Sequence, residues 1–216
     1  MDVAAERLHL ADWRRQFFEL YAEVRRVAVS DPRAAADRWR EAREALYRSH
    51  AASPVPLEAR PKFRAQHFPY DPALRFETVL VGGAAPAPSS LGLPTSLALP
   101  ASHDEGLAFD QIGWIEVPFP AGARRMGVYW LREYAGGLFL PFRDGTSGHE
   151  TYGAGRYVLD TAKGADLGGD VARGTIVVDF NFAYQPSCAF DPRWACPLAP
   201  RDNWLDVEVR AGERLV

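Results

Sequence analysis

Charged and amide side chains that can do chemistry gather in two stretches of the second half of the chain. Side chains alternate along a β-strand, so Glu150, Tyr152 and Arg156 share one face of a strand predicted over 151–159. By the same alternation, Asp179 and Asn181 point the same way from a strand predicted over 174–180. If these polar faces meet, they form a charged pocket whose predicted residues are Arg143, Glu150, Tyr152, Arg156, Asp179 and Asn181.

Such a pocket predicts binding of a small polar or anionic molecule, because arginine forks onto carboxylate and phosphate groups. The alternative is a hydrolytic enzyme, with Glu150 or Asp179 as general base and Asn181 or Arg156 stabilising developing negative charge. A purely structural interpretation stays open. Ion pairs such as Arg143 with Glu150, or Arg156 with Asp179, would then tie hairpins together.

Two other motifs suggest chemistry that the sequence does not support. Gly153-Ala154-Gly155 lacks the third glycine and the following helix of a dinucleotide loop, so it predicts a bulge or tight bend. Cys188 and Cys196 are expected to be buried thiols, and two thiolates alone do not complete a zinc site. No metal site is predicted, and no motif identifies a cofactor. A flavin-binding split barrel is an architectural option without a phosphate-gripping motif to support it.

Composition and charge exclude several classes of partner. The 216 residues carry a net charge of −3, with no run of basic residues that would bind a phosphate backbone, so nucleic acid is not an expected partner. No apolar stretch is long enough to cross a membrane, and the first ten residues contain no apolar signal core. We therefore expect a soluble cytoplasmic protein without a membrane partner. The oligomeric state stays open.

Apolar periodicity predicts a helical hairpin in residues 1–51, ahead of the polar stretches. Hydrophobic residues recur at three- and four-residue steps from Leu10 to Val27, which is typical of an amphipathic helix. Asp31-Pro32 then starts a second helix that extends to about Arg48. Because docking helices expose such stripes, a protein–protein interaction module built on this hairpin is a further alternative function.

Short strands separated by turn residues predict a β-rich domain in residues 62–216. The fold class predicted is α+β, with the helical hairpin packed on a mainly antiparallel β-barrel or two-sheet domain. The predicted strands are Leu74–Leu80, Gly113–Phe119, Met126–Leu131, Gly137–Phe142, Thr151–Leu159, Gly174–Phe180 and Trp204–Arg210.

Two sequence blocks resemble a known family. The run from Phe142 to Tyr157, and then Asp-Phe-Asn at 179–181, Cys-Pro-Leu at 196–198 and Asn203, are similar to domain-of-unknown-function family 1684, a family of uncharacterised bacterial proteins. Many members carry an extra β-rich region that this short chain lacks. The family has no established activity, so the resemblance implies a set of motifs and no reaction.

Overall fold

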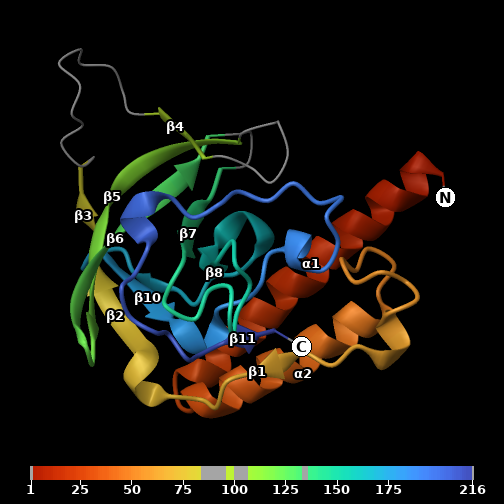
Figure 1. The fold of residues 1–216 in the computed structure, drawn as a ribbon, viewed down its shortest axis with the longest axis horizontal. Helices are drawn as coiled ribbons and strands as arrows, with labels where there is room; N and C mark the ends of the chain where they lie inside the picture. Colours follow the sequence, from red (N-terminus) through yellow and green to blue (C-terminus); the bar gives the residue numbers. More distant parts are fainter. Residues whose placement is uncertain (1, 84–95, 100–106, 133–135, 216) are drawn as a thin grey trace.

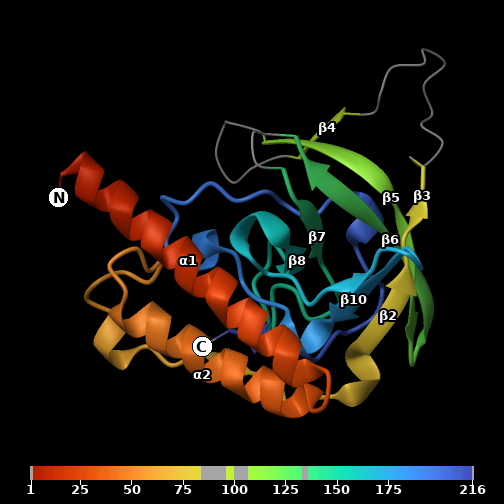
Figure 2. The same cartoon turned by 180° about the vertical axis from the view of Figure 1, so that it is seen from behind.

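The computed structural model describes residues 2–83, 96–99, 107–132 and 136–215. Two α-helices, α1 (Val3–Ala28) and α2 (Pro32–Ser49), form a hairpin that lies along one side of the β-region (Figures 1 and 2). The Asp31 carboxylate accepts a hydrogen bond from the Ala34 amide at 2.9 Å, and Pro32 occupies the first helical position. These are the start signals expected from the sequence, and they set the short turn of the hairpin.

The hairpin is anchored by the apolar face of each helix. Phe17, Tyr21 and Val24 of α1 and Trp39 of α2 are buried together with residues of the β-region. The Trp39 indole N–H donates to the Tyr21 hydroxyl at 3.0 Å, which satisfies the polar atom of a fully buried ring. Burial of each large side chain contributes roughly 1.5–3 kcal/mol, so this interface fixes the hairpin on the sheets.

The largest sheet is antiparallel. Its strands are β3 (Val81–Gly82), β4 (Ser96–Leu99), β5 (Leu107–Phe119), β6 (Gly122–Leu131), β7 (Leu138–Phe142) and β8 (Arg156–Asp160). They follow the order β3-β5-β6-β7-β8, and β4 pairs with β5 off this path. Leu140, Phe142 and Val158 of this sheet join a second hydrophobic core that does not involve the helices.

Two smaller antiparallel sheets complete the β-region. β2 (Arg75–Val79), β10 (Thr175–Asp179) and β9 (Gly169–Asp170) form one sheet, and β1 (Gln66–His67) pairs with β11 (Glu213–Arg214) beside α2 (Figure 1). Single turns of 3-10 helix lie in the connections between these elements, at Arg60–Lys62, Pro72–Leu74, Thr161–Lys163, Phe180–Phe182, Ser187–Ala189 and Arg201–Asn203.

The predicted α+β class with antiparallel sheets is confirmed, whereas a closed barrel is not. Among the strands that the structure describes, β3 and β8 end the path of the large sheet and do not pair with each other. The fold is therefore a set of open sheets covered by the hairpin. No helix in the described ranges is long and apolar enough to cross a membrane.

One predicted strand is wrong in part and another is wrong altogether. Residues 152–155 form a turn in which the Gly155 amide donates to the Tyr152 carbonyl at 2.9 Å, so β8 begins only at Arg156. Gly155 has φ +100°, and a side chain there would collide with the Phe142 carbonyl, which explains the glycine. This is the tight bend that the Gly-Ala-Gly motif predicts. The segment 204–210 is irregular, because its backbone bonds to the 143–145 turn instead of a strand.

Candidate ligand-binding site

Arg156, one of the six predicted site residues, is buried in a network that ties down the end of the chain. Its Nη1 donates to the carbonyls of Ala211 and, at 3.1 Å, of Glu213, and its Nη2 donates to the Val209 carbonyl at 2.8 Å. The same guanidinium pairs with Asp144 at 3.4 Å, and Asp144 also accepts from the Val209 amide at 2.7 Å. Its ion-pair partner is thus Asp144, and its bonds go largely to backbone.

Asp179 and Asn181 do lie together, as predicted, but they are fully buried at the end of β10. Asp179 accepts from the Asn181 amide at 3.0 Å and pairs with Arg75 at 3.1 Å. The Asn181 side chain bonds both the amide and the carbonyl of Asp71, each at 2.8 Å. Burial raises the pKa of Asp179, against the lowering effect of its bonds to Asn181 and Arg75. These contacts brace the 3-10 turn at Phe180–Phe182.

The other three predicted residues lie apart from this pair. Glu150 forms a half-exposed ion pair with Arg210 at 3.0 Å. The Arg143 guanidinium stacks over the Trp204 ring, 4.2 Å from its centroid. Burial, and then a hydrogen bond to Cys188, raise the pKa of Tyr152 to about 12. Among the described residues, hydrogen bonds and ion pairs within this set of six join only Asp179 and Asn181.

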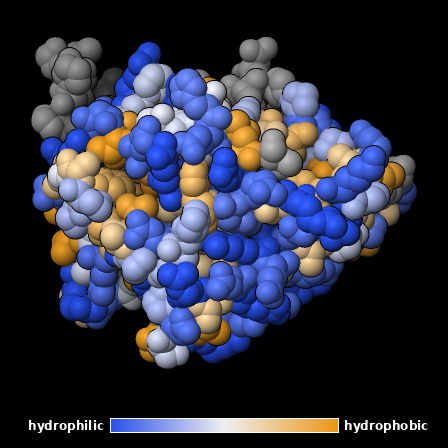
Figure 3. Space-filling view, turned by 60° about the horizontal axis from the view of Figure 1, so that its bottom comes forward, coloured by the Kyte–Doolittle hydropathy of each residue, from blue (hydrophilic) through white to orange (hydrophobic). Residues whose placement is uncertain are grey.

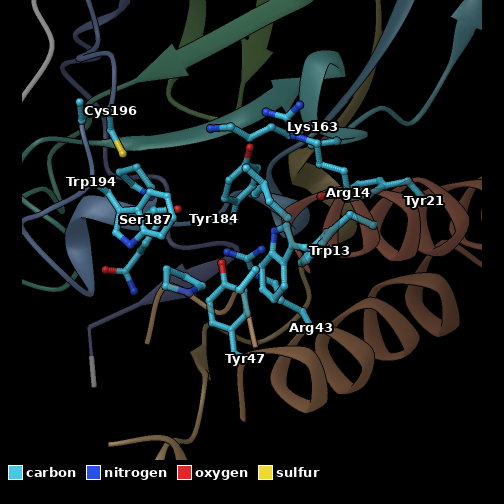
Figure 4. A pocket seen from close by; sticks show the side chains of 18 residues that line it. Trp13, Arg14, Tyr21, Arg43, Tyr47, Lys163, Tyr184, Ser187, Trp194 and Cys196 are labelled. Carbon is cyan, nitrogen blue, oxygen red and sulfur yellow. The ribbon is translucent and has the colours of Figure 1, made fainter. Parts of the chain in front are cut away.

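A pocket of about 200 Å³ lies elsewhere, between the hairpin and residues 184–196 (Figure 4). We call it the hairpin pocket. Helices α1 and α2 supply one side, the turn at Lys163 another, and the loop that carries the cysteines the third. The pocket is lined by Leu10, Trp13, Arg14, Phe17, Tyr21, Arg43, Tyr47, Ala52, Pro54, Lys163, Ala165, Tyr184, Gln185, Pro186, Ser187, Trp194, Ala195 and Cys196.

Arg43 of α2 is the buried charge of this pocket. Its Nε and Nη2 donate to the Glu213 carboxylate at 2.5 and 3.3 Å, and both side chains are 3% exposed. The guanidinium lies 4.3 Å from the Tyr47 ring centroid and 4.7 Å from that of Tyr184. Burial opposes the charge on Arg43, but Glu213 and then Tyr47 outweigh it, so the pKa of Arg43 rises above its ordinary value. Arg43 therefore stays charged at all ordinary pH values.

Three polar groups of the hairpin pocket have unused hydrogen-bonding capacity. The bonds of Arg43 engage Nε and Nη2, which leaves Nη1 without a hydrogen-bond partner among the described residues. Within the same ranges, the Tyr47 hydroxyl and the Ser187 hydroxyl also make no side-chain hydrogen bond. A few polar groups that converge on an otherwise apolar pocket are typical of ligand sites.

Aromatic rings make up much of the pocket wall. Trp13 packs on Tyr47 with ring centroids 5.5 Å apart and an interplanar angle of 29°. The ring centroids of Trp13 and Phe17 are 4.7 Å apart. Figure 4 shows Trp13, Tyr47 and Arg43 side by side, with Trp194 and Cys196 across the cavity. Such faces suit a flat apolar molecule.

The cysteine loop closes the pocket opposite the helices. The Cys188 amide donates to the Cys196 sulfur at 3.3 Å, and both residues are buried. The neighbouring Cys188 thiol, and then burial, raise the pKa of Cys196. A protonated thiol is a weak nucleophile, so Cys196 contributes to the lining of the pocket rather than to catalysis. Across the described part of the chain, no three of His, Cys, Asp and Glu cluster as a metal site would require.

Sequence reasoning missed the hairpin pocket, although one signal points to it. Trp39, Arg43 and Tyr47 follow each other at four-residue steps, which places an arginine in the middle of the apolar stripe of α2. A charge on a buried helix face needs a partner. The partner, Glu213, carries no comparable signal, because its position opposite Arg43 depends on the folding of the whole chain.

Comparisons with known proteins agree with the two sequence blocks. The family described as "protein of unknown function (DUF1684)" matches residues 63–214. The solution structure of an uncharacterised protein of Haloarcula marismortui is 31% identical, with a TM-score of 0.57, over 82% of this chain and 90% of that chain. No curated protein matches. The chain therefore belongs to the family of proteins of unknown function DUF1684.

Proposed function

We propose that this protein binds a small organic molecule in the hairpin pocket. The observation that carries the proposal is Arg43, a buried arginine in an aromatic cavity whose Nη1 has no hydrogen-bond partner among the described residues. Arg43 Nη1 and the Tyr47 hydroxyl are not sealed away from the cavity, so an acceptor on a ligand can reach both groups. A ligand oxygen placed there accepts their hydrogen bonds, and the aromatic wall contributes by apolar contact.

The proposal keeps the function expected from the sequence and moves its site. The predicted pocket rested on polar faces in the β-domain, whereas the unused hydrogen-bonding groups lie between the hairpin and residues 184–196. Arg156, Asp179 and Asn181 then have structural roles, since their bonds go to Asp144, Arg75 and neighbouring backbone.

Neither alternative function has comparable support. The enzyme alternative needs Glu150 or Asp179 as general base. Glu150 is paired with Arg210, Asp179 is fully buried, and neither residue lines the hairpin pocket. For a docking surface, Phe17, Leu20 and Tyr21 of the α1 stripe are buried. The face of the molecule that carries α2 is largely hydrophilic (Figure 3). These observations favour a ligand site over an enzyme centre or a protein interface.

A thermal-shift screen with a metabolite library tests the proposal. A ligand present at a hundred times its dissociation constant adds about 2.7 kcal/mol of stability, which is easily measured. The pocket-blocking variant is Ala195→Trp, because Ala195 is an exposed residue of the pocket lining. Its control is Ala45→Trp, at an exposed position of α2 outside the pocket.

We expect hits that stabilise the wild type and Ala45→Trp and have no effect on Ala195→Trp. A library that yields no stabilising compound, or only compounds that act equally on both variants, contradicts the proposal.

A further inference from the structure

We infer that the ligand of the hairpin pocket is a small aromatic carboxylate with a hydrogen-bond acceptor at the end of the ring system remote from the acid group. The inference rests on the proposed function and adds the chemical class of the ligand. Charge, ring geometry and size each support one part of it.

Charge selects an anion. Arg14, Arg43 and Lys163 line the pocket, and no Asp or Glu does. Glu213 neutralises Arg43, so the cations available to a ligand are Arg14 and Lys163. Lys163 is 52% exposed and only loosely paired, with Nζ 3.5 Å from Asp160, and Arg14 makes no ion pair to a described residue. A hollow next to the pocket does hold Glu6, but with Arg7 beside it.

The two cations lie on one side of the pocket. The turn after Lys163 packs on α1, where a side chain added at Gly164 would lie 3.2 Å from the Phe18 Cα, one helical turn from Arg14. Figure 4 shows Arg14 and Lys163 together above the ring of Tyr184. Two cations at one place suit a single carboxylate group, which accepts hydrogen bonds from both.

Figure 4 shows the donors without partners, on Arg43 and Tyr47, below the ring of Tyr184 and thus on the side away from Arg14 and Lys163. Arg43 is buried against Glu213, and the Tyr47 hydroxyl belongs to a ring that stacks on this guanidinium. Neither group needs a second negative charge, because Glu213 already balances Arg43. A neutral acceptor such as a phenol or carbonyl oxygen suits them. The ligand therefore carries charge at the Arg14 side and a neutral acceptor at the Arg43 side.

The wall between these ends selects an aromatic body of limited size. Trp13 and Tyr47 are stacked on each other, so they offer ring faces and edges rather than a slot between them. Aromatic contacts of this kind add about 0.5–1.5 kcal/mol beyond apolar burial. The cavity of about 200 Å³ is smaller than typical drug-sized pockets of roughly 300–1,000 Å³, which favours one or two rings over a nucleotide.

Calorimetric titration with three matched probes tests the inference. 4-Hydroxyphenylacetate has all three features, 4-hydroxyphenylacetamide lacks the charge, and 4-hydroxycyclohexylacetate lacks the aromatic ring. We expect the first to bind at least about tenfold more tightly than either of the others. Lys163→Gln and Arg14→Gln should weaken the acid about three- to tenfold and leave the amide unchanged. The matched controls are Lys62→Gln and Arg26→Gln, at exposed positions outside the pocket.

The outcomes separate the inference from the proposed function. If the amide or 4-hydroxycyclohexylacetate binds as tightly as the aromatic acid, or if the acid is insensitive to Lys163→Gln and Arg14→Gln, the inference is overturned. The inference is also overturned if none of the probes binds and the metabolite screen instead finds a cation or a sugar whose binding is lost in Ala195→Trp. The proposed function stands in that case. A screen in which no compound loses its stabilising effect in Ala195→Trp contradicts both the inference and the proposed function.

Discussion

Arg156 and Arg43 are both buried arginines paired with a carboxylate, yet they occupy regions of different character. Arg156, in the sequence block that marks the family, directs both terminal nitrogens at Asp144 and the backbone carbonyls of residues 209–213. Arg43, in the hairpin pocket, binds Glu213 through Nε and Nη2 and presents Nη1 to a cavity. The first arrangement fastens one chain segment to another, and the second leaves a donor for something else.

This difference offers a criterion for sorting buried polar residues. A polar side chain whose bonds run to backbone of its own protein contributes to the fold, since those bonds replace ones that water would make. A side chain with remaining donors that face a cavity is a candidate for recognition. Asp179, Asn181 and Asn203 fall in the first group. Asn203 is the clearest case, because its side-chain amide bonds the amide and carbonyl of Gly127 and the carbonyl of Pro141.

The largest expected effect comes from removal of Arg156. Arg156→Met leaves Asp144 buried without its cation and removes the bonds to residues 209–213, which should cost about 3–5 kcal/mol of unfolding free energy. Urea denaturation measures it. Arg143→Met is the matched control, since Arg143 stacks on the half-exposed Trp204 and should cost below about 1 kcal/mol. Equal losses in the two variants would contradict the distinction.

A pH-dependent effect of similar size is expected at His67, which pairs with Glu213 across β1 and β11. Burial lowers the pKa of His67 from 6.5 to about 4, and its Nε2 has no hydrogen-bond partner among the described residues. Between these values the unfolded chain binds a proton that the folded chain does not, so stability falls as the pH falls through this window. A pKa shift of this size corresponds to a loss of about 3 kcal/mol in the free energy of unfolding.

His67→Phe should remove that part of the acid sensitivity. Its unfolding free energy at pH 7 should stay close to that of the wild type, because the ring packs against Trp39 and no hydrogen bond is lost. Denaturation curves at pH 7 and about pH 4 provide the measurement. Parallel losses for variant and wild type would show that His67 takes up its proton equally in the folded and unfolded states.

A smaller effect tests the pocket side of the comparison. Tyr47→Phe removes a hydroxyl that has no hydrogen-bond partner among the described residues, so the unfolding free energy should change by less than about 0.5 kcal/mol. Affinity for a ligand acceptor at this place should fall about tenfold, which equals about 1.4 kcal/mol. Calorimetry and urea denaturation on the same sample measure both. A large loss of stability with unchanged affinity would show that Tyr47 contributes to the fold and not to ligand recognition.

The smallest effect is expected at Glu150. Its ion pair with Arg210 has side chains 32% and 58% exposed, so Glu150→Gln should cost under about 1 kcal/mol and less still in high salt. Thermal unfolding at two salt concentrations measures this. A loss near that of Arg156→Met would mean that Glu150 has a buried role that the structure does not show.

The sequence was sufficient for the two helices and several of the strands, and insufficient for the site. Periodic apolar residues and the Asp31-Pro32 cap predicted both helices, because these signals act within one or two turns. The polar face of the strand at 151–159 failed because Gly155 turns the chain just before Arg156. Arg156 and Asn181 were predicted as pocket residues, but the backbone groups that they bind lie 53–57 and 110 residues away. Local patterns do not specify contacts at that range.

The Arg43–Glu213 pair also has a consequence for how the protein is made. The two residues are 170 positions apart, and synthesis at about 5–20 residues per second separates them by roughly 10 to 30 s. During that interval α2 has emerged with Arg43 in its apolar stripe and no carboxylate to neutralise it. The hairpin therefore cannot bury this stripe at low cost until Glu213 has been added, so docking of the helices waits for a residue made 170 positions later.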